Sequence, residues 1–534
     1  MKSFCLSFTL LLGIAIFAPA ANNPEQPRLV VHIVIDGIQS EHLATLWNLF
    51  DNGGFKRIYG QGAVCRYAYY PILSSGTASD YATIVCGTTP YYHGITGNFF
   101  YDRKSGRLQP SLKDPATAGI GTSETLSPKT LLASTLSDEL KMNSGGKSKV
   151  FSIGINGQEA ILLAGHAGDG AVWIDNASGS FATTSFYPLG LPRWADQMNV
   201  DRSLLNAMST DWLPLRPINS YLFPPKRKDA SNGFIYYNSG MSTTERIAYF
   251  KQTPFVNQII KDAAIKAITA EKLGSGANTD YLGLQFSLRI GGDDSFELLS
   301  AEKEDMYLRL DKYLAELIDK IDQSVGLNHT LFVITGSQGE IHSQNTLSSY
   351  RISGGTFSPA SSMALLNLYL MALYGQNQWV TGYYNKNIYL DQTGIDKKGV
   401  SIDAIREHAA NFMLELQGVQ TAFTTPEILH SDGKGYDEQS RMKNSYNKNQ
   451  SGDIVFTLMP GWVEADASGK IISFSNRKET YVPLIFFGYS ISSQVINSAN
   501  ITDVAPTLSN LLHIPSPNAS TGRNLTLLLN ESKH

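Results

Sequence analysis

The chain has 534 residues, of which 42% are hydrophobic and 17% are charged, and this composition excludes a disordered protein. The formal net charge is −4, so the sequence offers no basic surface that would bind nucleic acid or an anionic membrane. We find no internal repeat and no Pro-, Gly- or Ser-rich linker, which favours one elaborated domain over several. The expected partners are small molecules or other proteins.

Residues 1–20 have the pattern of a cleaved export signal. Lys2 precedes an apolar run from Phe4 to Phe17, and Ala18 to Ala20 supplies the small residues of a cleavage site. No later stretch reaches the roughly 20 apolar residues that a membrane-spanning helix needs. We therefore expect residues 1–20 to be a signal peptide and residues 21–534 to be a protein of the periplasm or the extracellular space.

Cys65 and Cys86 are the only cysteines beyond this signal. Export into an oxidising compartment permits a disulfide between them. Two buried, unreactive thiols are the alternative, and the sequence leaves both open because it does not show how far apart the two residues lie.

Five short apolar runs, each followed by small or polar residues, are typical of strands buried on both faces of a parallel sheet. Asp36 follows the first run directly. Because ligands of open α/β sheets bind at the carboxyl ends of the strands, Asp36 is a candidate site residue. The five runs are Leu29–Ile35, Lys149–Ile155, Tyr281–Ser287, Thr330–Thr335 and Val482–Phe487.

Helical periodicity occupies three stretches between these runs: Lys129–Met142, Phe255–Lys272 and Glu304–Val325. Strands that alternate with helices predict an α/β, doubly wound fold, with a mostly parallel central sheet and helices on both faces. Residues 185–249 and 344–452 break this rhythm and are rich in Tyr, Asn, Ser and Gly. We interpret these two stretches as cap segments inserted over the active edge of the sheet.

The segment PILSSGTASDYATIVCG, residues 71–87, is followed by PYYHGITGN at residues 90–98. This pattern resembles the nucleophile motif of the alkaline phosphatase superfamily, as found in single-chain periplasmic alkaline phosphatases and in type I phosphodiesterase/nucleotide pyrophosphatases. The family's nucleophilic Thr stands ten residues before the Gly that closes its helix, and counting back from Gly87 gives Thr77. A hydroxyl at a helix N-terminus suits this chemistry because the helix dipole and free N–H groups favour an alkoxide and a phosphate. Further family blocks follow in the family's order: Gly53–Arg57, Leu131–Leu140, Ala164–Ala167, Ser451–Ile454, Pro460–Trp462 and Ile501–Thr507.

The resemblance implies a mechanism in which a Thr alkoxide attacks phosphorus between two zinc ions. The first zinc site would use the Asp after the first strand, the Thr itself and an Asp-His pair. Asp36 and Thr77 match, whereas Ser337 and Gln338 replace the Asp-His pair, and neither is a good zinc ligand. Asp36 and Thr77 also have ordinary structural roles open to them, since Asp caps helices and Thr begins them.

The second zinc site would use an Asp, a His four residues later and a late His. Ile290, Asp294 and Tyr481 align with these positions, and an alignment shifted by a few residues would bring in Asp293. Isoleucine coordinates no metal. Two retained oxygen donors do not hold two zinc ions, so the resemblance predicts degenerate metal sites.

The side chains that would hold the phosphoryl group are replaced as well. The resemblance implies a Lys and an Arg two residues apart, where this chain has Asn156 and Gln158. Asp80 stands where relatives carry Asn or Gly, and its carboxylate would repel a phosphate dianion. Because losing one preorganised donor costs about 3–4 kcal/mol of transition-state stabilisation, these changes together predict the loss of efficient hydrolysis.

Two functional hypotheses follow. The first is an exported pseudoenzyme that binds an unidentified protein or small molecule in the cell envelope. The second is an active phosphomonoesterase or phosphodiesterase that uses Thr77 as its nucleophile with altered metal binding. A separate hypothesis concerns the cofactor: an oxygen-rich cluster would suit Ca²⁺ or Mg²⁺ better than zinc, and its members would be Asp36, Thr77, Asp294, Ser337 and Gln338.

Overall fold

The computed structural model describes residues 26–73, 76–225, 234–290, 299–337, 354–469, 471–474, 481–526 and 529. The expected signal peptide, residues 1–20, lies outside the described residues, and so do Asp293, Asp294 and Gln338. Within the described part of the chain, no helix combines the length and the apolar character needed to span a membrane.

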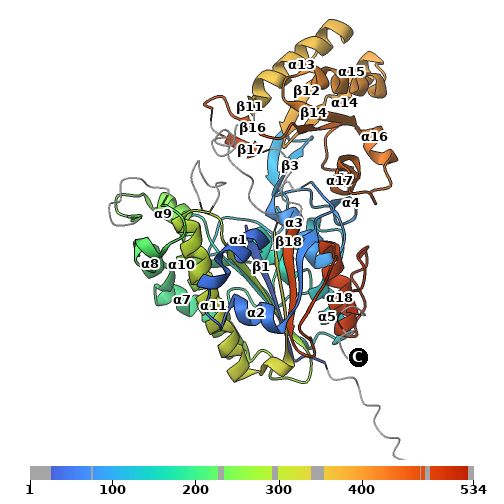
Figure 1. The fold of residues 1–534 in the computed structure, drawn as a ribbon. Coiled ribbons are helices and arrows are strands. Elements are labelled where there is room, and N and C mark those ends of the chain that lie inside the picture. Colours follow the sequence, from blue (N-terminus) through green and yellow to red (C-terminus); the bar gives the residue numbers. More distant parts are fainter. Residues whose placement is uncertain are drawn as a thin grey trace, which may run out of the picture.

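A ten-stranded sheet forms the centre of the molecule and carries helices on both faces (Figure 1). The five strands predicted from the sequence lie side by side in it, which confirms the mostly parallel α/β fold. The first strand pairs in parallel with two of the others, and the last of the five runs antiparallel. Across the sheet the order is β19 (Gln494–Val495), β2 (Ala63–Tyr69), β18 (Tyr481–Gly488), β10 (Thr330–Gly336), β1 (Leu29–Asp36), β9 (Asp280–Ser287), β6 (Val150–Gly154), β7 (Gly170–Ile174), β8 (Phe181–Thr184) and β5 (Gly119–Ile120).

The continuous apolar run of β1 is explained by the two cores that this strand separates. Leu29, Val31 and Ile33 belong to one buried cluster, whereas Val30 and Val34 belong to the other. Successive side chains of a strand point to opposite faces, so both faces of β1 must be apolar. The first core contains α1 (Ser40–Leu46), α2 (Phe55–Gln61), α10 (Pro254–Glu271) and α11 (Ala301–Ser324), and the second contains α3 (Thr77–Cys86), α5 (Leu136–Asn143), α6 (Gly157–Ala164) and α18 (Val504–Leu511).

Two of the three predicted helices match α10 and α11 closely, but the helix expected from Lys129 begins only at Leu136. Thr135 and Asp138 form a capping box, in which each side chain accepts a hydrogen bond from the other residue's backbone N–H group. This arrangement fixes the first turn of α5. The preceding residues form a separate 3-10 turn, η2 (Pro128–Thr130).

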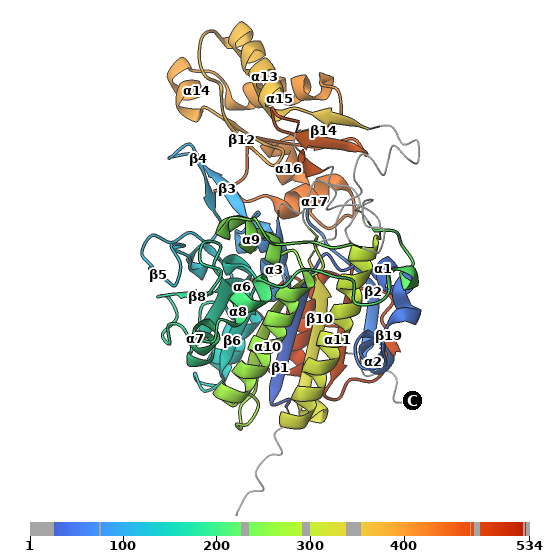
Figure 2. The same cartoon turned by 90° about the vertical axis from the view of Figure 1, so that its left-hand side faces the viewer.

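Residues 185–249 lie mostly beside α10 (Figure 2). Trp194, Met198 and Leu204 join the same core as α10. The end of the segment reaches the carboxyl edge of the sheet, where Ala248 lines an open cavity. The helices of this segment are α7 (Arg193–Val200), α8 (Ser203–Met208), η3 (Ile218–Ser220) and α9 (Thr243–Phe250).

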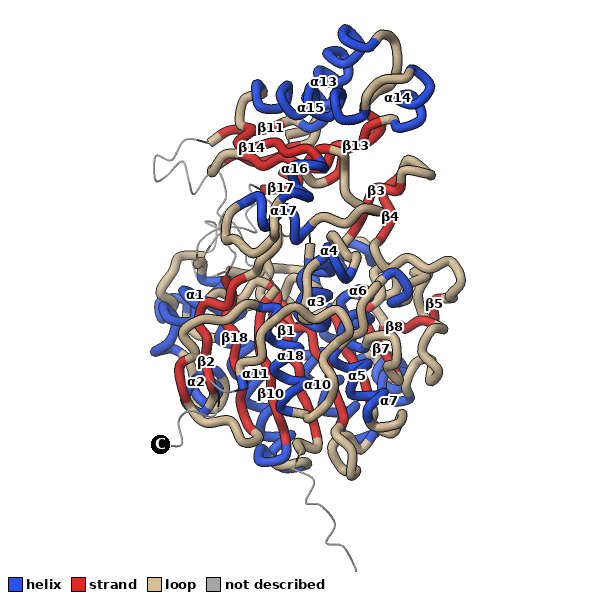
Figure 3. Tube along the Cα trace, turned by 90° about the vertical axis from the view of Figure 1, so that its right-hand side faces the viewer, coloured by secondary structure: helices blue, strands red, loops and turns tan. Residues whose placement is uncertain are grey.

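The chain from residue 354 to residue 474 builds a second body beyond the carboxyl ends of the central strands (Figures 2 and 3). It has its own buried core, which includes Leu366, Trp379 and Phe456. Its four-stranded antiparallel sheet has the order β12 (Val380–Tyr384), β13 (Asn387–Leu390), β15 (Ile454–Leu458) and β14 (Val419–Thr424), and β11 (Gly355–Phe357), β16 (Trp462–Ala465) and β17 (Ile471–Phe474) form a smaller sheet. Its helices are α13 (Pro359–Tyr374), α14 (Gln392–Lys398), α15 (Ile402–Glu415), α16 (Thr425–His430) and α17 (Glu438–Ser445).

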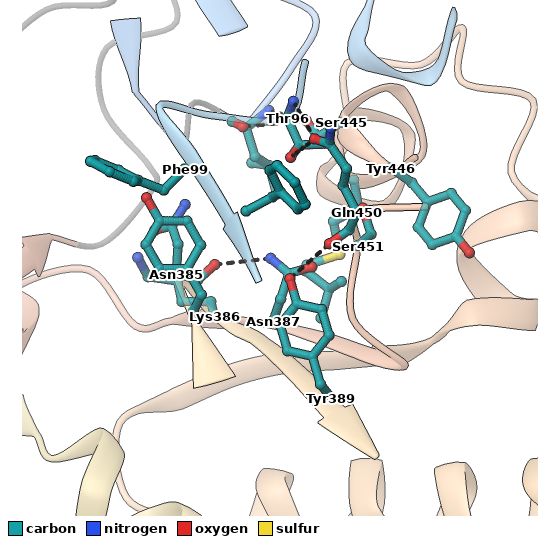
Figure 4. A pocket seen from close by; sticks show the side chains of 15 residues that line it. Thr96, Phe99, Asn385, Lys386, Asn387, Tyr389, Ser445, Tyr446, Gln450 and Ser451 are labelled. Atoms are coloured by element: carbon teal, nitrogen blue, oxygen red, sulfur yellow. Dashed lines mark hydrogen bonds between the residues drawn. The ribbon is translucent and has the colours of Figure 1, made fainter. Parts of the chain in front are cut away.

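The hairpin of β3 (Phe99–Asp102) and β4 (Arg107–Pro110) ties the second body to the first. Arg103 forms an ion pair of 2.9 Å with the buried Asp453, and the Thr96 hydroxyl donates to Gln450 over 2.9 Å. Figure 4 shows the small pocket at this junction, lined from both bodies. Its volume of about 40 Å³ holds only a few water molecules, so this pocket is not a ligand site.

Cys65 on β2 and Cys86 at the end of α3 are both buried free thiols. The structure therefore contains no disulfide between them. Burial raises the pKa of both thiols, which keeps them protonated and unreactive.

Candidate active site

Asp36 lies at the carboxyl end of β1 and is 4% exposed. Its Oδ2 accepts a hydrogen bond of 2.8 Å from the Gln285 side-chain amide, and its Oδ1 accepts one of 3.2 Å from the Tyr81 hydroxyl. Burial, followed by the negative charges of Asp36 and Glu159, raises the pKa of Tyr81 well above its ordinary value. Tyr81 therefore remains a hydrogen-bond donor, and both carboxylate oxygens of Asp36 are occupied by neutral donors.

Thr77 begins α3, as the motif predicted. Gly76 precedes it with a φ of 140°, and a Cβ atom there would lie 2.5 Å from Asn98 Oδ1, so this position requires glycine. The Thr77 hydroxyl donates a short hydrogen bond to the Glu159 carboxylate and lies 3.3 Å from Asn98 Oδ1. Asn98 Oδ1 also accepts the Ala78 N–H group over 2.8 Å, which fixes the start of the helix.

Glu159 is a site residue that the sequence reasoning missed. It stands in the first turn of α6 and is 2% exposed. Burial raises the pKa of its carboxyl group, Asp36 adds to this effect, and the hydrogen bond from Thr77 opposes it. The one signal in the sequence was an acidic residue in a mostly apolar helix. The structure places this acid directly against the Thr77 hydroxyl.

Asn156 and Gln158, which stand at the positions of the family's Lys and Arg, lie at the start of α6. The Gln158 side chain bridges two backbone groups: it donates to the Asn98 carbonyl over 3.0 Å and accepts from the Leu112 N–H group over 3.1 Å. Asn156 lines the open cavity, and its Oδ1 lies 3.4 Å from Lys251 Nζ. A cation from another segment thus approaches one of the two replaced positions.

The surroundings of the remaining predicted positions that the structure describes differ from one another. Ile290 is 7% exposed and lines the same cavity as Asp36 and Thr77. Ser337 follows β10 and is fully buried, and its hydroxyl has no hydrogen-bond partner among the described residues. Tyr481 is 49% exposed and lies among other tyrosine rings.

Asp80 is buried in α3, 1% exposed. Burial and then the charge of Asp80 raise the pKa of Tyr70, whose hydroxyl donates to the Gly336 carbonyl over 2.7 Å. Asp80 therefore lies near the end of β10 and adds negative charge close to the Asp36 carboxylate.

The open cavity at this edge of the sheet has a volume of about 450 Å³. Lys251 and Arg289 both line it. Lys251 Nζ donates to the Ile174 carbonyl and to Asn176 Oδ1, each over 2.7 Å. Burial lowers the pKa of Lys251 to about 8, against the opposing influence of Glu124 and other acids. The Lys251 and Arg289 side chains thus supply the positive charge of the cavity.

The described residues do not fit a pair of zinc ions. The two oxygens of Asp36 accept from Gln285 and Tyr81, and Ile290 offers no donor atom. Among the residues that the structure describes, no group of three His, Cys, Asp or Glu side chains could hold a metal ion. Asp36, Thr77 and Ser337 are the described members of the oxygen-rich set predicted for Ca²⁺ or Mg²⁺.

A threonine at a helix N-terminus, beside an aspartate at the end of the first strand of such a sheet, defines a protein with the hydrolase fold of the alkaline phosphatase superfamily. Within it, the chain belongs to the type I phosphodiesterase/nucleotide pyrophosphatase family, whose model matches residues 30–480. The resemblance inferred from the motifs is confirmed.

Relatives of known name match nearly the whole chain. Alkaline phosphatase PafA of Elizabethkingia meningoseptica is 27% identical over 97% of this chain and 98% of its own length. Alkaline phosphatase PhoV of Synechococcus elongatus is 29% identical over 94% of this chain and 93% of its own. The crystal structure of PafA superposes with a TM-score of 0.85 at 26% identity, covering 95% of this chain and 99% of that one.

Proposed function

We propose that this protein is exported, has lost two-zinc phosphoester hydrolysis and acts as a ligand-binding protein of the cell envelope. The observation that carries the proposal is the shortage of ligands around Asp36: among the described residues, no group of three His, Cys, Asp or Glu side chains could hold a metal ion. Asp36 and Thr77 line one cavity, and a zinc site needs at least three protein ligands. Ile290, on the wall of the same cavity, supplies no compensating ligand.

The test uses residues 21–534, purified with zinc supplied throughout. We expect less than one zinc ion per chain by elemental analysis, and no more hydrolysis of p-nitrophenyl phosphate or bis(p-nitrophenyl) phosphate than a Thr77→Ala variant shows. Two zinc ions per chain, together with turnover that Thr77→Ala abolishes, would refute the proposal. Export is tested separately, by N-terminal sequencing of the protein from the medium and from the periplasm.

A second candidate function is metal-independent hydrolysis, favoured by the hydrogen bond from Thr77 to Glu159. Glu159 would accept the proton of the Thr77 hydroxyl as its oxygen attacks phosphorus, and the bond from phosphorus to the leaving oxygen would break. Glu159 would return the proton to the leaving oxygen, and water would then hydrolyse the phosphothreonine. The raised pKa of Glu159 suits a general base. Activity that survives EDTA and falls about 10²–10⁴-fold in Glu159→Gln would establish this function; activity equal in Glu159→Gln and the unaltered protein would exclude it.

A further inference from the structure

Two cavities adjoin at the candidate site and differ in charge. The cavity of about 450 Å³ described above contains Lys251 and Arg289. A second cavity, of about 430 Å³, contains Glu124 and Glu159. The side chains that line both cavities, and so lie where the two cavities adjoin, are Asn98, Asn156 and Asn176.

Polar contacts link the side chains at this junction of the two cavities. Lys251 Nζ donates to Asn176 Oδ1 over 2.7 Å, and the Asn176 amide donates to Glu124 Oε1 over 3.3 Å. The asparagine therefore stands between the ammonium group and the carboxylate. The Asn176 amide separates the Lys251 ammonium group from the Glu124 carboxylate, so the two charges form no ion pair with each other.

Each cavity keeps a charged group without a matching countercharge. In the described part of the chain, Lys251 has no carboxylate within 4.0 Å, and Glu124 Oε2 is buried without a hydrogen-bond partner. A buried charge is costly unless it is paired, so both groups favour a ligand of opposite charge.

Two further charged side chains of these cavities are engaged within the protein. Asp36 accepts from Gln285 and Tyr81 in the first cavity. In the second cavity, Lys113 Nζ donates to Gln109 over 2.7 Å on the exposed side. Among the described residues, Lys251 in the first cavity and Glu124 in the second therefore form no ion pair.

We propose that the two cavities together bind an amino-alkyl phosphate, with its phosphate beside Lys251 and Arg289 and its ammonium group beside Glu124 and Glu159. The proposal rests on the ligand-binding function proposed above and names its ligand class. The pKa of Lys251, about 8, leaves this side chain protonated at neutral pH, and a bound phosphate would favour that form further. A bound ammonium group would in the same way favour ionised Glu159.

The experiment compares three probes by isothermal titration calorimetry at pH 7, without zinc, on residues 21–534. O-phosphoethanolamine carries both charges, ethyl phosphate carries only the anion, and ethylamine carries only the cation. We expect O-phosphoethanolamine to bind at least about ten-fold more tightly than ethyl phosphate, since a charged pair is worth about 1.4 kcal/mol or more. Equal affinities for these two probes, or no binding of either, would overturn the proposal.

Variants assign the two ends of the ligand. Glu124→Gln should lower the affinity for O-phosphoethanolamine to that for ethyl phosphate and leave ethyl phosphate unchanged. Lys251→Met should weaken both phosphates. The matched controls are Glu407→Gln and Lys398→Met on the second body, which should change neither affinity. An unchanged preference in Glu124→Gln contradicts the proposal, and thermal unfolding of each variant verifies that it is folded.

The outcome is separable from that of the proposed function. Zinc-dependent turnover would refute the loss of hydrolysis whatever the ratio of probe affinities. The ratio, measured without zinc, tests only the pairing of charges across the two cavities.

Discussion

The Gln285 side chain offers the sharpest test of how this site is built. It is fully buried on β9 and makes three hydrogen bonds. Its amide nitrogen donates to Asp36, and its oxygen accepts the N–H groups of Ile155 and Asn156 over 2.7 Å and 3.1 Å. The substitution Gln285→Met keeps the size of the side chain and removes all three bonds.

The expected cost follows from these contacts. A hydrogen bond to a charged group contributes about 1.5–3 kcal/mol, and each buried N–H group left unpaired costs about 1–3 kcal/mol. The lower ends of these ranges together give about 3.5 kcal/mol of lost stability for Gln285→Met. Gln252→Met is the matched control, because Gln252 lines the same cavity but is only partly buried and has no such bonds; it should cost less than about 0.5 kcal/mol.

Urea unfolding followed by tryptophan fluorescence measures both variants. A second substitution, Gln285→Glu, keeps both acceptor bonds but brings a second carboxylate to about the 2.8 Å that now separates the amide from Asp36. Like charges this close raise the apparent pKa of the pair, so the stability of Gln285→Glu should fall as the pH rises through that pKa. If Gln285→Met costs no more than Gln252→Met, the amide does not hold Asp36 and the reasoning fails.

Three further predictions concern other contacts. Burial opposes the charge of His166, but its bond of 2.9 Å to Asp138 outweighs this effect and raises the pKa of His166. The stability that this pair contributes should be complete below the ordinary pKa of histidine and should disappear as the pH rises through the raised pKa. In a pH series of thermal unfolding, the His166→Gln variant should lack this pH-dependent contribution. Gly76→Ala places a Cβ atom 2.5 Å from Asn98 Oδ1 at a φ of 140°; we expect a loss of about 1–3 kcal/mol in urea unfolding, and a neutral effect would show that the turn relaxes freely. Asp311 accepts the N–H groups of Asp51 and Phe55 over 2.9 Å and 2.6 Å at the start of α2; Asp311→Ala should cost about 2–4 kcal/mol, whereas Asp319→Ala, which removes an exposed ion pair on the same helix, should cost under about 1 kcal/mol by the same assay.

The central sheet was well predicted because a strand that is buried on both faces has a recognisable apolar sequence pattern. Each of the five predicted strands is a mostly apolar run in the centre of the sheet. The short edge strands β5 and β19, of two residues each, carry no such pattern. The start of α5 was misplaced because the apolar residues 131–133 precede the helix, and only the capping box marks the boundary.

The site was predictable only where the local sequence carried a signal. The spacing of the motif indicated Thr77, and the position directly after an apolar run indicated Asp36. Gln285 lies 249 residues from Asp36 in the sequence and is a polar residue within an apolar strand. The pattern of apolar residues does not indicate what such a residue contacts. Lys251 comes from the segment expected to cap the sheet, and nothing near it in the sequence indicates that it faces Asn156. Contacts that join distant segments require the fold.

The position of Asp36 has a consequence for the evolvability of this scaffold. Its strand lies between β9 and β10, and the neighbouring site positions Ile290 and Ser337 come just after those two strands end. The residues that set the chemistry therefore lie outside the apolar runs that hold the sheet together. Natural selection can exchange reactive groups at the carboxyl ends of these strands one by one while the sheet retains its shape. The same fold can therefore acquire new functions.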